Sequence, residues 1–99
     1  MIVYSNMRFL VVDDFSDFRS SVKGMLGQMA AQHIDIAANG EEALSLCRKT
    51  RYDVILHDYN LGQGKNGQQV LEELHHEKLI SPHCIFIMVT AESSQAMVM

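Results

Sequence analysis

This sequence lacks the long apolar segments that mark membrane-spanning proteins. No apolar run among its 99 residues approaches the roughly 20 residues that a membrane-spanning helix needs. Residues 1–7 also lack the charged region, the apolar region and the cleavage site of a signal peptide. We therefore expect a cytoplasmic protein without a membrane segment.

Positively charged residues are fewer than negatively charged ones. The chain has 8 Lys and Arg residues against 12 Asp and Glu residues, which gives a formal net charge of −4. The densest basic group, Arg48, Lys49 and Arg51, is too small for the electrostatic footprint of a nucleic-acid or anionic-membrane site. We therefore expect neither kind of partner for this domain.

Cysteine and histidine motifs for transition metals, and nucleotide-binding motifs, are missing as well. Cys47 and Cys84 lie in apolar patterns and form no Cys-x-x-Cys pair, so we expect two reduced, buried thiols. His57 and the pair His75-His76 are not spaced as a shared histidine site, and we expect core or solvated histidines. Neither a Walker loop nor Gly-x-Gly-x-x-Gly follows the first apolar run, which makes a nucleotide-binding domain the least favoured α/β alternative.

What the sequence does have is a regular alternation of apolar runs with amphipathic segments. Continuously apolar runs are typical of strands covered on both faces, and apolar residues spaced by three and four are typical of helices. The predicted strands are 8–12, 34–38, 53–57 and 84–89, and the predicted helices are 15–31, a segment following Asn39-Gly40, 67–78, and a fourth that starts at residue 91. Gly24 and Gly27 lie inside the first helix, where each costs about 1 kcal/mol relative to Ala, so we expect close packing there.

This alternation predicts an α/β fold with a doubly wound parallel sheet, because right-handed crossovers place helices on both faces. With 99 residues, 47% of them hydrophobic, the chain suits a single domain over residues 1–99 with one core. In the doubly wound order 2-1-3-4, the first and third strands are neighbours at the point where a crevice opens. We expect the functional site at the carboxyl ends of these two strands.

Acidic and hydroxyl side chains follow three of the predicted strands. Asp13 and Asp14 follow the first strand, Asp58 follows the third, and Thr90 follows the fourth. Because parallel strands bring their carboxyl ends to one edge, three carboxylates converge there, and like charges at short range either raise a pKa or bind a cation. Oxygen ligands at an open site favour a hard divalent ion, Mg²⁺ first, with Mn²⁺ or Ca²⁺ as substitutes.

Four motifs occur in a characteristic order: Asp13-Asp14, residues 39–44, Asp58 and Thr90-Ala91. In this order and spacing they resemble the receiver domain of bacterial two-component response regulators, and the resemblance covers the chain from Arg8 onward. It implies a flavodoxin-like fold of the CheY type and a phosphoacceptor module of a phosphorelay. Asp58 would take a phosphoryl group from a histidine kinase or phosphotransfer protein, and the domain would then switch conformation to control an output domain or a partner protein.

The resemblance also implies roles for the other site residues. Asp14 would bind Mg²⁺ directly, Asp13 directly or through water, Asp58 through its carboxylate, and Asn60 through its backbone carbonyl. Thr90 would be the switch hydroxyl that turns toward the phosphoryl group. The implied chemistry is at most self-phosphorylation and self-dephosphorylation, and not that of a conventional enzyme.

Two departures from the family pattern affect the site. Gly62 stands where the family usually has proline, and Gly67 comes one residue later than the family's glycine, which we interpret as the same turn with one residue added. The family also continues through a fifth strand that carries a lysine and through a fifth helix, whereas this chain ends at Met99 with no lysine after Lys78. We therefore expect a domain truncated on its C-terminal side, with the fourth strand exposed as an edge, which either self-associates through that edge or is poorly stable alone.

Two other functions fit part of this pattern. A small phosphatase with an Asp nucleophile would share the strand-end acids and Mg²⁺, but its first strand should carry Asp-x-Asp, where this chain has Asp13-Asp14. An interaction or dimerisation module that no longer takes phosphate fits the missing lysine, whereas the intact set of acids argues against it.

Overall fold

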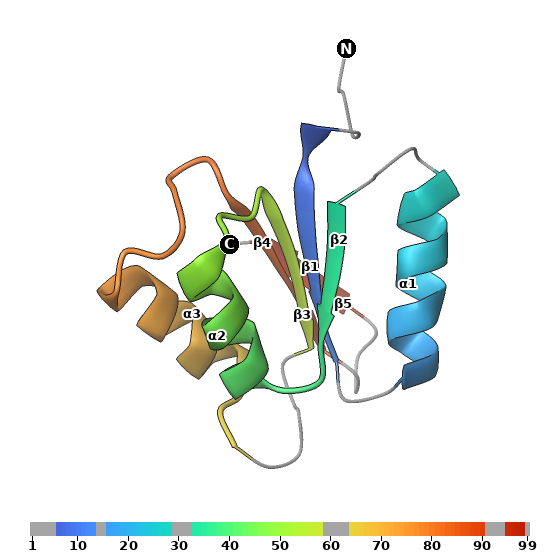
Figure 1. Ribbon diagram of the computed structural model, residues 1–99. Helices are drawn as coiled ribbons and strands as arrows, with labels where there is room; N and C mark the ends of the chain where they lie inside the picture. Colours follow the sequence, from blue (N-terminus) through green and yellow to red (C-terminus); the bar gives the residue numbers. More distant parts are fainter. Residues whose placement is uncertain (1–5, 14–15, 29–32, 59–63, 91–94, 99) are drawn as a thin grey trace.

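One five-stranded sheet organises this computed structural model, which describes residues 6–13, 16–28, 33–58, 64–90 and 95–98 (Figure 1). The strands are β1 (Arg8–Val12), β2 (His33–Ala37), β3 (Val54–Asp58), β4 (Ile85–Thr90) and β5 (Gln95–Val98). The helices are α1 (Ser16–Gln28), α2 (Gly40–Lys49) and α3 (Gly67–His76). Helix α1 covers one face of the sheet, and α2 and α3 cover the other.

The parallel strands follow the order predicted from the sequence. The sheet order is β2-β1-β3-β4-β5, and the pairs β1–β2, β1–β3 and β3–β4 are all parallel. This arrangement confirms the doubly wound fold with the order 2-1-3-4. Strands β1 and β3 are neighbours in the middle of the sheet, so their carboxyl ends lie together at one edge.

The larger hydrophobic cluster fills the space between the sheet and helices α2 and α3. Its buried side chains come from alternate strand positions, from the inner faces of the two helices and from the segment between α2 and β3: Leu10, Val12, Ala37, Ala43, Leu44, Cys47, Tyr52, Ile55, Val70, Leu71, Leu74, Phe86 and Met88. Both helices start with an asparagine cap: Asn39 accepts the Glu42 N–H at 2.8 Å, and Asn66 accepts the Gln69 N–H at 2.9 Å. The caps fix where each helix begins, beside the carboxyl edge of the sheet.

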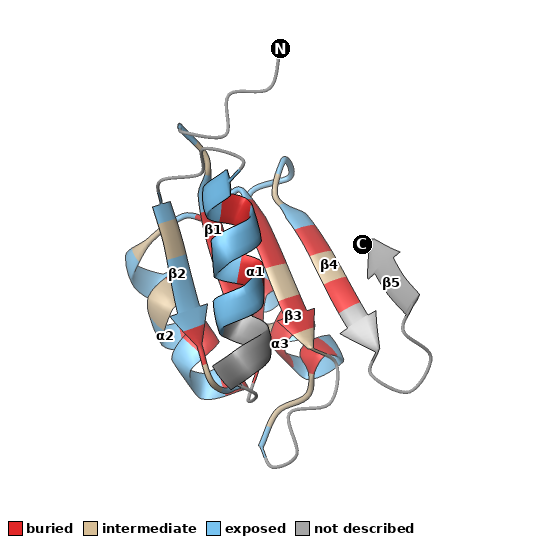
Figure 2. Cartoon of the chain, turned by 90° about the vertical axis from the view of Figure 1, so that its right-hand side faces the viewer, coloured by how far each residue is buried: buried red, intermediate tan, exposed pale blue. Residues whose placement is uncertain are grey.

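The opposite face of the sheet has a smaller cluster under α1. Its buried members are Phe9, Val11, Val22, Leu26 and Val54. Figure 2 shows α1 lying over the β1 side of the sheet, with β4 to one side of the helix. This face is therefore covered less completely at β4, where Ile85 remains 44% exposed.

The C-terminal segment differs from the prediction. The sequence predicts a helix that starts at residue 91, but Gln95–Val98 form β5, which pairs antiparallel with β4 from Thr90↔Gln95 to Ile87↔Val98. An unpaired strand edge presents backbone N–H and C=O groups, and a strand that turns back onto it satisfies them. The prediction that β4 is an exposed edge is therefore wrong, because β5 is the outermost strand on that side.

Candidate functional site

Strand β3 carries Asp58 at its carboxyl end. The strand is preceded by Asp53, whose carboxylate accepts a hydrogen bond from the Arg8 backbone N–H at 2.8 Å. Alternate positions along β3 bury Ile55 and His57 completely, whereas the Asp58 side chain is half-buried. A buried strand therefore delivers this carboxylate to the sheet edge, as the sequence predicts.

Asp13 lies beside Asp58 at the same edge. It directly follows β1, its backbone N–H donates to the Ala37 carbonyl at 3.1 Å, and its side chain is only 7% exposed. Val12 pairs with His57, so the next residues along these two parallel strands are Asp13 and Asp58. Two carboxylates, one buried and one half-buried, therefore occupy adjacent strand ends.

Strand β4 brings the backbone of a third predicted site residue to this edge. Asp58 pairs with Val89, and Thr90 is the next residue and the last one of β4. Asp14 and Asn60, the other two predicted metal ligands, lie outside the described residues. The structure thus brings Asp13, Asp58 and the backbone of Thr90 together at the ends of three neighbouring strands.

The described side chains at this edge suit a hard cation. Asp13 and Asp58 offer carboxylate oxygens, which are the ligands that Mg²⁺ prefers in proteins. Within residues 6–13, 16–28, 33–58, 64–90 and 95–98, no three His, Cys, Asp or Glu side chains are grouped as a metal cluster. Two of the four predicted ligands fall outside those ranges, so the described carboxylates represent half of the predicted set.

His57 occupies the larger core directly before Asp58. Its side chain is 0% exposed, and its ring stacks on Phe86 with the centroids 5.7 Å apart and the planes at 24°. Its Nδ1 lies 2.7 Å from the Asp58 carbonyl oxygen, and its buried Nε2 has no hydrogen-bond partner. Burial lowers the pKa of His57, although the hydrogen bond to the Asp58 carbonyl acts in the opposite direction. The sequence predicts either a core or a solvated histidine here, and the structure shows the core position. No sequence signal indicates the bond from His57 to the Asp58 backbone.

In the described part of the chain, Lys65 and Arg48 pair with glutamates of α3 and not with the acids at this edge. Lys65, the first lysine after Asp58, donates from Nζ to Glu73 at 2.9 Å, and this hydrogen bond raises the pKa of Lys65. Arg48 on α2 donates to Glu73 at 3.1 Å and to Glu77 at 2.9 Å. The Arg48 pairs join α2 to α3, and the Lys65–Glu73 pair holds the Lys65 side chain against α3.

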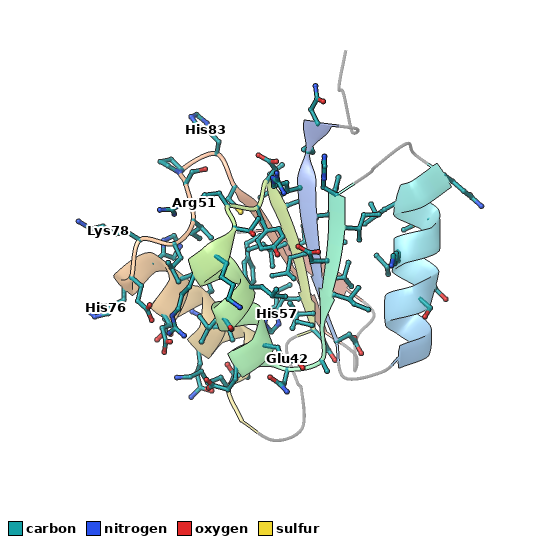
Figure 3. The ribbon with its side chains drawn as sticks, in the orientation of Figure 1. Glu42, Arg51, His57, His76, Lys78 and His83 are labelled. Carbon is teal, nitrogen blue, oxygen red and sulfur yellow. The ribbon has the colours of Figure 1, made fainter. Side chains whose placement is uncertain are left out.

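The two ends of the parallel sheet differ in the side chains that they carry. Figure 3 shows His57 and Glu42 near the carboxyl ends of the strands, with Arg51 and Lys78 near the opposite end. Arg51 donates a hydrogen bond to the Lys78 carbonyl at 2.8 Å. Arg51 and Lys78 are therefore remote from the edge that holds Asp13 and Asp58.

Together, the doubly wound sheet and the adjacent strand-end carboxylates define an α/β domain with an acidic site at its switch point. Comparison with known protein families identifies the particular kind of domain. Residues 9–99 match the family model for the response regulator receiver domain, and the chain belongs to this family. It is a CheY-like receiver domain of two-component signalling.

Individual relatives agree with this assignment. The chain is 31% identical to chemotaxis protein CheY-3 of Vibrio cholerae over 94 residues, which cover 95% of this chain and 71% of the relative. Among solved structures, response regulator TrrA of Thermotoga maritima, in complex with Mg²⁺-BeF, is 34% identical with a TM-score of 0.75, over 88% of this chain and 71% of that chain. CheY4 of Vibrio cholerae is 31% identical with a TM-score of 0.76, over 89% of this chain and 71% of that chain. No helix in the described part of the chain is long and apolar enough to cross a membrane.

Proposed function

We propose that this receiver domain accepts a phosphoryl group on the carboxylate of Asp58, with Mg²⁺ bound beside it. The observation that carries the proposal is the register of β1 and β3, which places Asp13 and Asp58 at adjacent strand ends. Asp14 and the backbone carbonyl of Asn60 complete the proposed set of metal ligands. The TrrA structure, a complex with Mg²⁺-BeF, supports this assignment because its fold and its sequence are similar to those of this chain.

The proposed reaction needs a positioned nucleophile and little else from the protein. A carboxylate oxygen of Asp58 attacks the phosphorus atom of a phosphohistidine on a partner kinase or phosphotransfer protein. The new P–O bond forms as the P–N bond breaks, and the departing imidazole nitrogen keeps the electron pair and takes a proton from solvent. Bound Mg²⁺ would neutralise negative charge on the phosphoryl oxygens. Asp58 is half-buried at the end of β3, so its carboxylate has a defined place and is still open to a donor. Positioning of the nucleophile is the main task in phosphoryl transfer.

The same site supplies the proposed switch. Thr90 ends β4 one residue beyond the partner of Asp58, and its backbone also pairs with Gln95 of β5. In the proposal, the Thr90 hydroxyl contacts the phosphoryl oxygens, and this contact changes the segment that follows β4. The altered surface then controls an output domain or a partner protein.

Mass spectrometry after incubation with acetyl phosphate and Mg²⁺ tests this proposal directly. We expect the intact protein to gain the mass of one phosphoryl group, because acetate can leave with the electron pair when Asp58 attacks. Asp58→Asn should abolish the gain. Asp53→Asn is the matched control, since Asp53 precedes the same strand at its opposite end and should leave labelling intact. Absence of labelling in the unmodified chain would refute the proposal and favour an interaction module.

A further inference from the structure

We propose that His57 is a positioning residue for the phosphoacceptor: it fixes the backbone carbonyl of Asp58 and thereby the direction of the Asp58 side chain. This inference rests on the proposed function of Asp58. It assigns a role to a buried histidine that does not touch the phosphoryl donor.

The hydrogen bond of His57 has a definite direction. A backbone carbonyl oxygen only accepts, so the Nδ1 atom that lies 2.7 Å from the Asp58 oxygen must carry the hydrogen. The neutral ring is therefore protonated at Nδ1, and the bare Nε2 is the atom left without a partner in the core. A buried nitrogen such as this Nε2, which accepts no hydrogen bond, costs free energy. The ring packing and the hydrogen bond at Nδ1 must together outweigh that cost.

The packing around the ring leaves it little freedom to move. Val12 of β1 and Met88 of β4 flank His57 in register on the two sides, and both are 0% exposed. The Phe86 ring stacks on the imidazole from two residues earlier along β4. A donor held on three sides makes a rigid support for whatever it binds.

The support acts on the residue that carries the chemistry. The Asp58 carbonyl belongs to the peptide group that links Asp58 to the next residue, so a bond to it restricts the ψ angle of Asp58. Allowed side-chain rotamers depend on the backbone angles, and the direction of the carboxylate is therefore restricted as well. Because small misplacements of a reacting group lower a rate strongly, losing this donor should slow attack by Asp58.

Two variants of equal shape isolate the donor. His57→Asn keeps an N–H donor close to the Nδ1 position, whereas His57→Leu has the same branching without any donor. His57→Phe restores the ring volume and the stacking on Phe86, again without a donor. Ile55→Val, two residues earlier on the same buried face, serves as a control for a slightly loosened core.

The measurement is the rate of phosphorylation by acetyl phosphate across a range of donor and Mg²⁺ concentrations, together with urea unfolding of each variant. We expect His57→Leu and His57→Phe to lower the maximal rate about 10-fold or more with little change in the half-saturating concentrations, since the fault lies in orientation and not in binding. His57→Asn should recover most of the rate, and Ile55→Val should stay near the unmodified rate. If the role of His57 were purely structural, the phosphorylation rates of the variants would follow their stabilities, and His57→Asn would react no faster than His57→Leu.

The outcomes separate this inference from the function on which it rests. If the unmodified chain is phosphorylated on Asp58 and His57→Leu reacts as fast as His57→Asn, the positioning role is refuted while the proposed function stands. If one donor-free variant fails to unfold cooperatively, the other one is compared with His57→Asn in its place. If the unmodified chain is not labelled at all, the proposed function has failed.

Discussion

Two aspartates at opposite ends of β3 have different environments and therefore different expected roles. Asp53, before the strand, accepts the Arg8 N–H, whereas Asp58, at its carboxyl end, lies beside the buried Asp13. Asp53 accepts a hydrogen bond from the backbone, whereas Asp58 lies beside a second carboxylate. A divalent cation should therefore bind at Asp58 and not at Asp53. Comparing the two gives a test of metal binding that does not depend on phosphorylation.

Adding Mg²⁺ should stabilise the folded domain, and the effect should require Asp58. A cation that binds only the folded state adds about 1.4 kcal/mol to the free energy of unfolding for each tenfold rise above its dissociation constant. Thermal unfolding followed by circular dichroism, with and without Mg²⁺, measures this gain and its reversal by a chelator. Asp58→Asn should lose most of it and Asp53→Asn should retain it. Equal stabilisation of both variants would contradict the placement of the metal.

At the scale of the helices, the glycines fall into two kinds that the sequence does not separate. The sequence predicts close packing at Gly24 and Gly27, but both are exposed and neither has a described atom within 4 Å of an added Cβ, so that prediction is wrong. Gly40, the first residue of α2, is the crowded one: an added Cβ would lie 2.8 Å from Val70 Cγ2 and 3.2 Å from the Lys65 carbonyl oxygen. The contact between the start of α2 and α3 therefore depends on Gly40.

Substituting the two kinds of glycine with alanine should have opposite effects on stability. Gly24→Ala should raise the free energy of unfolding by about 0.5–1 kcal/mol, because alanine is the better helix former and nothing obstructs it. Gly40→Ala should lower it by about 1–3 kcal/mol, because overpacking against Val70 and a backbone carbonyl outweighs the helix preference. Urea denaturation of the pair measures both changes, and a stabilising Gly40→Ala would show that α3 yields easily.

The strand and helix pattern was predictable because each parallel element carries its own periodicity. The runs that became β1 and β3 are apolar from Phe9 to Val12 and from Val54 to Leu56, and the place of Asp13 and Asp58 at one edge follows from the parallel order. The C-terminal segment was not predictable in the same way, because β5 depends on the open edge of β4 and not on its own pattern. The bond from His57 to the Asp58 carbonyl depends on ring orientation in the packed core, which strand alternation does not specify.

For the molecule as a whole, the two faces of the sheet contribute unequally to stability. The face under α2 and α3 holds the larger cluster, and His57 lies within it beside Phe86. The α1 face holds the smaller cluster and leaves Ile85 partly exposed. His57 therefore becomes exposed to water only when the larger cluster unfolds. Protonation of its ring should then change the free energy of unfolding with pH.

The free energy of unfolding should fall as the pH drops below about 6.5, the ordinary pKa of histidine. The pKa of His57 is lowered in the folded state by burial, so the unfolded chain binds the proton first. Between the two pKa values, protonation favours unfolding with a slope of up to about 1.4 kcal/mol per pH unit. Above about pH 7.5 the ring is almost entirely neutral in both states, and this contribution no longer changes with pH. Urea unfolding of the unmodified chain and of His57→Phe from pH 8 to pH 5 isolates the effect, because the variant has no group that binds a proton at this position.

Parallel pH profiles for the two proteins would show that the folded chain accommodates a charged His57. The complete burial of this side chain and its stacking on Phe86 argue against that result.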